Sequence, residues 1–239
     1  MPRPLLPLLA RWHARHPHVH DVGGWPVAVF PGVFDPVMTK VGLWLSEIAP
    51  AYVRPGERWL ELGTGSGIVA AALARAGARV SASDLDETAA RNARFNAALS
   101  EVEVDVRVGD LFAPWSPPAV PGGGDGGPTV VAPGPGGPER GGVGRPFDVI
   151  VANLPFWPGT ASDLPIGHAF GAGERFELLR RFVAEAPAFA PTALLALSEN
   201  FSAFAEARAA IHPAATLLRR DRFRGEWLNL FVIGERPAL

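Results

Sequence analysis

The stretch RWLELGTGSGIVAAALAR, residues 58–75, decides the fold class. It begins with the apolar pattern of a buried strand, passes through Gly63, Gly65 and Gly67, and continues from Ile68 into good helix formers. Glycine tolerates positive φ and carries no side chain, so the backbone can turn sharply here and approach a ligand closely. The stretch therefore predicts a strand, a tight ligand-binding turn and a helix.

The same alternation of strand and helix continues along the chain. Further strands are predicted at residues 79–83, 102–108, 147–152, 193–198, 216–223 and 227–235, and helices at 87–99, 174–188 and 201–211. A turn at Arg224 and Gly225 joins the last two strands. This order predicts an α/β fold with a Rossmann-like, doubly wound, mostly parallel seven-stranded sheet and an antiparallel C-terminal strand.

The length of 239 residues fits one α/β domain with additions. We expect residues 1–50 to form an N-terminal cap segment over the active site, and residues 51–239 to form the main domain. Between about 114 and 146, glycine and proline dominate, and Trp115 is almost the only aromatic residue. Such a segment buries too little surface to offset its ordering entropy, so a disordered surface insertion is predicted.

Composition excludes several classes of protein. The chain has no cysteine, which removes disulfides, thiolate metal sites and a cysteine nucleophile, and which suits the cytoplasm. No apolar run approaches the length of a membrane span. A formal net charge of -2 argues against a general positive field for nucleic acid. A basic run comprises Arg219, Arg220, Arg222 and Arg224. We interpret it as the charged protection of a strand edge, with a local basic patch as the alternative.

Polar side chains follow the ends of the predicted parallel strands. They are Glu61, Asp84, Asp110 and Asn153. Because open α/β sheets bind ligands at the carboxyl ends of their strands, these four residues are candidate site residues.

The glycine motif has a rival interpretation. Gly65, Gly67 and Ala70 satisfy the dinucleotide pattern G-x-G-x-x-G/A, and Asp84 lies near the offset of a ribose-binding acid. Glu61 argues against a pyrophosphate, because a carboxylate would repel it, whereas a ligand with sulfonium and ammonium groups would be attracted. The polar, proline-stiffened loop after residue 152 also has no role in a dinucleotide fold.

Four motifs in order carry a family resemblance. They are Glu61-Leu62-Gly63-Thr64-Gly65-Ser66-Gly67, Asp84, Gly109-Asp110-Leu111-Phe112 and Asn153-Leu154-Pro155-Phe156. This set resembles the class I S-adenosylmethionine-dependent methyltransferases, in particular the HemK-like and "small domain" N-methyltransferase group, over roughly residues 31–198. The resemblance implies S-adenosyl-L-methionine as cofactor. The implied cofactor site is Asp35, Thr39, Glu61, Gly63, Thr64, Gly65, Gly67, Asp84, Leu85, Asp110, Leu111 and Asn153.

The resemblance also implies particular roles. The three glycines would bed the methionine part, Asp84 would hold the ribose hydroxyls, and Asp110 with Leu111 would touch the adenine edge. The implied catalytic loop is Asn153, Leu154, Pro155 and Phe156, with Phe156 and Trp157 stacking on a planar substrate. The chain departs from the group at Leu154, where a first proline is usual, and in having only about fifty residues before the main domain.

The predicted reaction is transfer of a methyl group to nitrogen by in-line displacement, with a small-molecule or amide substrate preferred. Ribosomal RNA or a protein glutamine are alternative acceptors, and a nicotinamide-dependent reductase or a non-catalytic cofactor-binding protein are alternatives of another class. Histidines at 13, 16, 18 and 20 raise the question of a metal. Because Pro17 interrupts helical spacing and only Asp21 offers a nearby acid, no metal site is expected.

Overall fold

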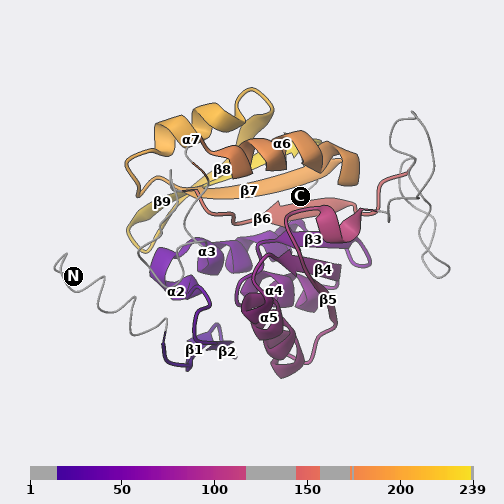
Figure 1. Ribbon diagram of the computed structural model, residues 1–239, viewed down its shortest axis with the longest axis vertical. Coiled ribbons are helices and arrows are strands. Elements are labelled where there is room, and N and C mark those ends of the chain that lie inside the picture. Colours follow the sequence, from indigo (N-terminus) through magenta and orange to yellow (C-terminus); the bar gives the residue numbers. More distant parts are fainter. Residues whose placement is uncertain (1–14, 117–143, 157–172, 174, 238–239) are drawn as a thin grey trace.

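A seven-stranded sheet forms the centre of the molecule (Figure 1). The computed structural model describes residues 15–116, 144–156, 173 and 175–237. The strands are β3 (Arg58–Leu62), β4 (Arg79–Asp84), β5 (Val104–Val108), β6 (Val149–Ala152), β7 (Thr192–Ser198), β8 (Ala215–Phe223) and β9 (Glu226–Gly234). Their order is β5-β4-β3-β6-β7-β9-β8, and β9 runs antiparallel to both of its neighbours. The predicted fold class is confirmed.

Helices cover both faces of this sheet. The helices are α2 (Pro36–Thr39), α3 (Val41–Ile48), α4 (Ile68–Arg75), α5 (Glu87–Leu99), α6 (Glu177–Phe189) and α7 (Phe204–Ile211). Figure 1 shows α3, α4 and α5 on one face, with α6 and α7 on the other. The chain order reverses between β3 and β6, which pair in parallel, so their carboxyl ends lie at the switch point where such sheets bind ligands.

The boundaries of the predicted elements shift by a few residues. The strand predicted from residue 102 begins at Val104, because Val102 donates its N–H to the Ala97 carbonyl and so closes the end of α5. The helix predicted from residue 201 begins at Phe204. The basic run lies in β8 at the edge of the sheet, apart from Arg224 in the following turn; Arg219 contacts Asp221, and Arg220 contacts Glu199. Its interpretation as a charged strand edge agrees with this position.

The N-terminal segment contains structure that the sequence analysis did not assign. A hairpin of β1 (His18–Val22) and β2 (Trp25–Val29) stands outside the main sheet, and α2 and α3 follow it. Helix α3 is buried on nearly every side and belongs to the same hydrophobic core as the sheet. Trp44 is 1% exposed, and its indole N–H donates to Asp221 at 2.9 Å. The hydrophobic core therefore begins well before β3.

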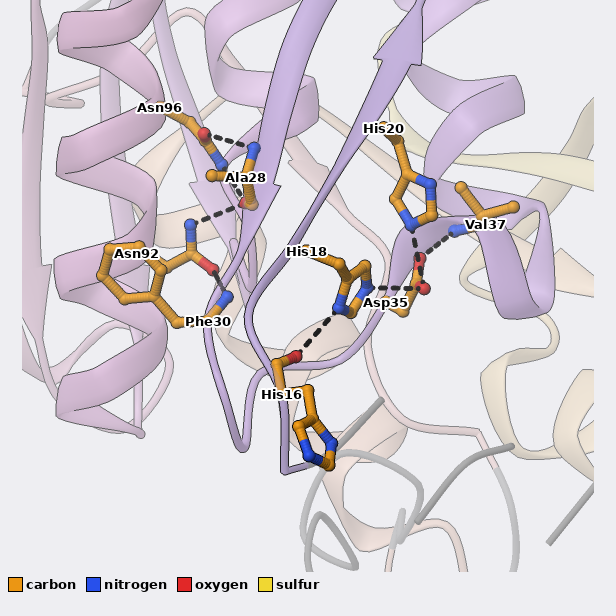
Figure 2. Close-up of polar contacts among 9 residues, drawn as sticks. All are labelled: His16, His18, His20, Ala28, Phe30, Asp35, Val37, Asn92 and Asn96. Atoms are coloured by element: carbon orange, nitrogen blue, oxygen red, sulfur yellow. Dashed lines mark hydrogen bonds and ion pairs between the residues drawn. The ribbon is translucent and has the colours of Figure 1, made fainter. Parts of the chain in front are cut away.

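Two buried asparagines of α5 attach the hairpin to the domain (Figure 2). Asn96 accepts from the Ala28 N–H at 2.9 Å and donates to the Ala28 carbonyl at 2.7 Å. Asn92 accepts from the Phe30 N–H at 2.8 Å, and Asn96 also donates to the Ser66 carbonyl in the glycine loop. These side-chain amides thus make the hydrogen bonds that a neighbouring strand would make along β2. Backbone groups that burial would otherwise leave unpaired are satisfied in this way.

The predicted insertion is described only at its two ends. Residues 113–115 form a short 3-10 helix, and Trp115 packs edge-on against Phe147 at 5.6 Å between ring centroids. Residues 117–143 lie outside the described residues, and so does the prediction made for them.

Replacing Asn96 with alanine is expected to lower the free energy of unfolding by about 2–3 kcal/mol. The substitution leaves the Ala28 N–H and the Ser66 carbonyl buried without this partner, and each such loss costs roughly 1–3 kcal/mol. Urea unfolding measures the effect. Arg91→Ala, an exposed position on the same helix, serves as control and should change stability by less than about 0.5 kcal/mol. Equal stability of the two variants would contradict the bridging role.

Candidate functional site

The loop between β3 and α4 needs glycine for two separate reasons. Gly63, Gly65 and Gly67 have φ values of 69°, 54° and 78°, in the left-handed region that other residues rarely adopt. A Cβ atom on Gly67 would lie 2.7 Å from the Ala93 Cα of α5, so this glycine also permits close packing. A Cβ atom on Gly65 would meet nothing within 4 Å. The loop is therefore packed on one side and open on the other.

Glu61 is buried at the end of β3. It is 3% exposed, and its Oε2 accepts from the Thr64 hydroxyl at 2.6 Å and from the Ala70 N–H at 3.0 Å. Burial raises the pKa of Glu61 to about 8; the hydrogen bonds from Thr64 and Ala70 reduce this effect, and the nearby charge of Asp84 adds to it. A positively charged ligand group beside this carboxyl would favour its ionised form.

Asp84 ends β4 and holds the glycine loop. Its Oδ2 accepts from the Gly65 N–H at 2.8 Å, and its Oδ1 accepts from the Asp86 N–H at 3.0 Å. The next residue, Leu85, is 65% exposed, although a large apolar side chain is usually covered. The end of β4 thus presents a carboxylate and an apolar side chain next to the loop.

The residues after β5 adopt a strained turn. Leu111 has φ 45° and is buried, and its carbonyl accepts from the Ser83 hydroxyl at 3.2 Å. Asp110 is about half exposed and pairs with Arg181 of α6 at 2.8 Å. This ion pair, which links two distant parts of the chain, had no signal in the sequence.

The loop after β6 carries Asn153, Leu154, Pro155 and Phe156. Leu154 and Phe156 are buried, and the Phe156 ring packs against Phe201 at 4.8 Å between centroids. Phe156 is therefore largely a packing residue, although it also lines the cavity described below. Trp157 lies outside the described residues.

One cavity brings these motifs together at the carboxyl ends of β3, β4, β5 and β6. Among the described residues it is lined by Gly32, Val33, Phe34, Pro36, Gly42, Glu61, Gly63, Thr64, Gly65, Ser66, Ile68, Val69, Ser83, Asp84, Leu85, Asp86, Ala89, Gly109, Asp110, Leu111, Asn153, Leu154, Pro155, Phe156 and Leu178. Most of the predicted site residues are in this set. Gly42, on α3, and Leu178, on α6, also line the cavity but were not predicted from the sequence. A contact with a distant helix leaves no local sequence pattern.

Asp35 and Gly67 are predicted cofactor residues that do not line the cavity. Thr39 is the last residue of α2, and its side chain lies outside what the structure describes. Asp35 is 2% exposed and accepts from the Val37 N–H at 2.8 Å, and so caps α2. Its neighbours Phe34 and Pro36 line the cavity instead. The predicted entry segment therefore reaches the cavity through Phe34 and Pro36, and Asp35 between them does not line it.

Asp35 contacts two histidines of β1 (Figure 2). The Nε2 atoms of His18 and His20 both lie 3.0 Å from its Oδ2. Burial by itself would raise the pKa of Asp35, but hydrogen bonds from Val37 and His20 and the charge of His20 outweigh it and lower the pKa. Asp21 is therefore not the acid that accompanies the histidines; Asp35, from another segment, is. His18 and His20 can both reach it because residues two apart on a strand share a face.

The known proteins that this chain resembles in sequence are methyltransferases. Residues 39–122 match the family model described as ribosomal protein L11 methyltransferase (PrmA). The "Ribosomal protein L11 methyltransferase" of Caldicellulosiruptor saccharolyticus is 46% identical over 66 residues, which cover 27% of this chain and 22% of the relative. The matched segment thus spans about a fifth of that relative.

Solved structures agree over more of the chain. The ribosomal protein L11 methylase of Lactobacillus delbrueckii subsp. bulgaricus superposes with a TM-score of 0.53 at 18% identity, covering 87% of this chain and 84% of that chain. The T. thermophilus 16S rRNA N2 G1207 methyltransferase, in complex with AdoMet and guanosine, gives 0.57 at 19% identity over 92% of this chain and 50% of that chain. The fold is that of the class I methyltransferases. The family model and the sequence relatives, together with this fold, agree with the predicted methyltransferase class and its cofactor; they do not single out a HemK-like subgroup.

The preference for a small-molecule substrate was wrong. The relatives found by sequence are named for protein acceptors, either ribosomal protein L11 or protein L-isoaspartate, and the preference had rested only on net charge. Net charge describes the average field around a protein, whereas an acceptor is recognised locally.

None of the helices in the described part of the chain has the length and hydropathy of a membrane span.

Stability should depend on pH through Glu61. Between the ordinary value of 4.5 and about 8, the folded chain keeps a proton that the unfolded chain has lost, so this carboxyl makes stability fall as pH rises. Glu61→Gln keeps an acceptor for Thr64 and Ala70 but cannot ionise. Urea unfolding of both proteins across this range should show the wild type losing stability relative to the variant. A difference that does not vary with pH would contradict the assigned protonation.

Proposed function

We propose that this chain is an S-adenosylmethionine-dependent methyltransferase that methylates a nitrogen of a ribosomal protein. One observation carries the proposal: the glycine loop, a buried acid, the β4 carboxylate and the Asn153–Phe156 loop all line a single cavity. The matched family model and those sequence relatives that are named for ribosomal protein L11 support the substrate class.

The cofactor is proposed to lie along the glycine loop. The open side of Gly65 leaves room for the methionine part, and Glu61 supplies negative charge for the ammonium and sulfonium groups. Asp84 would accept from the ribose hydroxyls, since its carboxylate lines the cavity and acts only as a hydrogen-bond acceptor when ionised. Leu85 and Leu111 offer apolar contact to the adenine, and the segment around Phe34 and Pro36 would cover the bound molecule.

The acceptor nitrogen is proposed to bind at the loop after β6. Methyl transfer from a sulfonium needs little chemical assistance, because the charged leaving group is already activated; alignment and exclusion of water remain. The Asn153 side chain and the Leu154 carbonyl could each accept a hydrogen bond from the nitrogen and aim its lone pair at the methyl group. Pro155 restrains Leu154 to extended conformations, which keeps that carbonyl in place.

A protein acceptor is favoured over ribosomal RNA by the state of the basic run. The charges of Arg219 and Arg220 are neutralised by Asp221 and Glu199, so β8 offers less attraction to phosphates than its sequence suggests.

The decisive experiment is transfer of labelled methyl groups to ribosomal fractions. The full chain, with tritiated S-adenosylmethionine, is incubated with separated ribosomal proteins and ribosomal RNA. Acid-stable label in the protein fraction, resolved to a modified nitrogen by mass spectrometry, is the expected result. Label in RNA alone would transfer the proposal to the rRNA alternative. Failure to bind S-adenosylhomocysteine would overturn the methyltransferase assignment itself, and tight binding of NADH would favour a reductase.

Asp84→Ala should weaken S-adenosylhomocysteine binding by about 1.5–3 kcal/mol, the range for hydrogen bonds to a charged group. Calorimetric titration measures it. Because the alanine also removes the acceptor of the Gly65 N–H, Asp84→Asn is needed as a second variant that keeps a side-chain oxygen. Glu103→Ala, an exposed acid beside β5, is the charge control and should bind normally. Unchanged affinity in both Asp84 variants would remove this residue from the site.

Asn153→Ala should separate binding from chemistry. The variant keeps the glycine loop and Asp84, so S-adenosylhomocysteine affinity should remain near normal. Methyl transfer should slow about a hundredfold or more, because losing one well-placed polar group in a water-poor site costs roughly 3 kcal/mol of transition-state stabilisation. Single-turnover transfer and a binding titration on the same sample measure both. Wild-type turnover would show that Asn153 does not position the acceptor.

A further inference from the structure

Two imidazoles and one carboxylate converge outside the cofactor cavity. His18 and His20 project from the same face of β1 toward Asp35, which precedes α2 (Figure 2). The three ligand atoms, the two Nε2 atoms and Asp35 Oδ2, all lie within 4.8 Å of one another. The hairpin and the start of α2 are separate in the sequence, so only the folded chain assembles this group.

The outer atoms of the group are held in the manner of a metal site. The Nδ1–H of His18 donates to the His16 carbonyl at 3.0 Å, which directs Nε2 toward Asp35. The other carboxylate oxygen of Asp35, Oδ1, accepts from the Val37 N–H at 2.8 Å, which directs Oδ2 toward the histidines. Metal-bound histidines commonly donate their second nitrogen to a carbonyl in this way, and such outer bonds fix the tautomer and the ring orientation.

The bonding of His18 leaves one ring nitrogen for an ion. Its Nδ1 contacts the His16 carbonyl, and its Nε2 faces Asp35. A divalent ion between Nε2 and Oδ2 would leave the Nδ1 hydrogen bond unchanged. Each Nε2 lies 3.0 Å from Oδ2, a few tenths of an ångström less than the roughly 3.3–3.4 Å between two tetrahedral ligands about 2.0–2.1 Å from one ion, so a small outward movement of these side chains would admit the ion.

We propose that His18, His20 and Asp35 bind a divalent transition-metal ion, with Zn²⁺ the best match. Two imidazole nitrogens and one carboxylate oxygen suit Zn²⁺, whereas Mg²⁺ and Ca²⁺ prefer oxygen ligands alone. The side chain of His20 is 24% exposed, so solvent can reach the group and supply a further ligand.

The ion would connect the hairpin to the rim of the cofactor cavity. Asp35 lies between Phe34 and Pro36, and both of these line the cavity. The Asn92 and Asn96 contacts hold β2 against α5, and the ion would hold β1 against the start of α2. The proposal does not rest on the methyltransferase assignment, because it concerns a separate group of side chains and is tested with the ion alone.

The test is calorimetric titration of the metal-free full chain with Zn²⁺, repeated with Mg²⁺. One equivalent of Zn²⁺ should bind, and Mg²⁺ should not compete. His18→Gln, His20→Gln and Asp35→Asn should each weaken this binding at least about a hundredfold, since even loss of an outer partner costs 10–100-fold. Asp35→Asn keeps an oxygen to cap α2, and circular dichroism confirms that each variant is folded.

His16→Gln is the matched control. It removes an imidazole from the same segment but leaves the His16 carbonyl that holds His18, so Zn²⁺ should bind as in the wild type. Loss of the equivalent in this control, to the same extent as in His18→Gln, would indicate nonspecific histidine binding and overturn the proposal. Absence of stoichiometric Zn²⁺ binding to the wild type, or its retention in both His18→Gln and His20→Gln, would also overturn it; the cluster would then be a hydrogen-bonded ion pair that fastens the hairpin.

Discussion

The close approach of the glycine loop to α5 is the constraint on which the rest of the site depends. At Gly67 the backbone has φ 78°, and no space remains for a side chain against Ala93. This contact sets how near α5 lies to the end of β3. From that position Asn96 reaches both the loop, at Ser66, and the hairpin, at Ala28. One helix therefore fixes the glycine loop and the N-terminal segment relative to each other.

Glu61 gives the site a preference for positively charged ligand groups. A buried carboxyl without a cationic partner is costly in its ionised form, and the raised pKa reflects this cost. The hydrogen bonds from Thr64 and Ala70 fix one oxygen without supplying a positive charge. A cationic ligand would supply it. In the sequence, Glu61 argued against a pyrophosphate ligand. In the structure, its burial strengthens the preference of its charge for a cationic ligand over an anionic one.

The N-terminal segment contributes to two neighbouring sites with alternate residues. Phe34 and Pro36 line the cofactor cavity, while Asp35 between them contacts the histidines of β1. This alternation explains why Asp35, a predicted cofactor residue, does not line the cavity although both of its neighbours do. A motif establishes that a stretch of chain approaches a ligand, whereas the direction of each side chain depends on local backbone angles and on the elements that surround it.

The sequence by itself determined the sheet, its flanking helices after residue 58 and about half of the residues that line the cavity. These features follow from hydrophobic periodicity and from glycines at a turn, which act within a few residues of chain. Only the tertiary structure decided the burial of α3, the pairing of Asp110 with Arg181, the asparagine contacts to β2 and the meeting of Asp35 with His18 and His20. Each of these joins segments that are separate in the sequence. Their partners are chosen by packing, because a side chain carries no local record of which distant group the fold will bring to it.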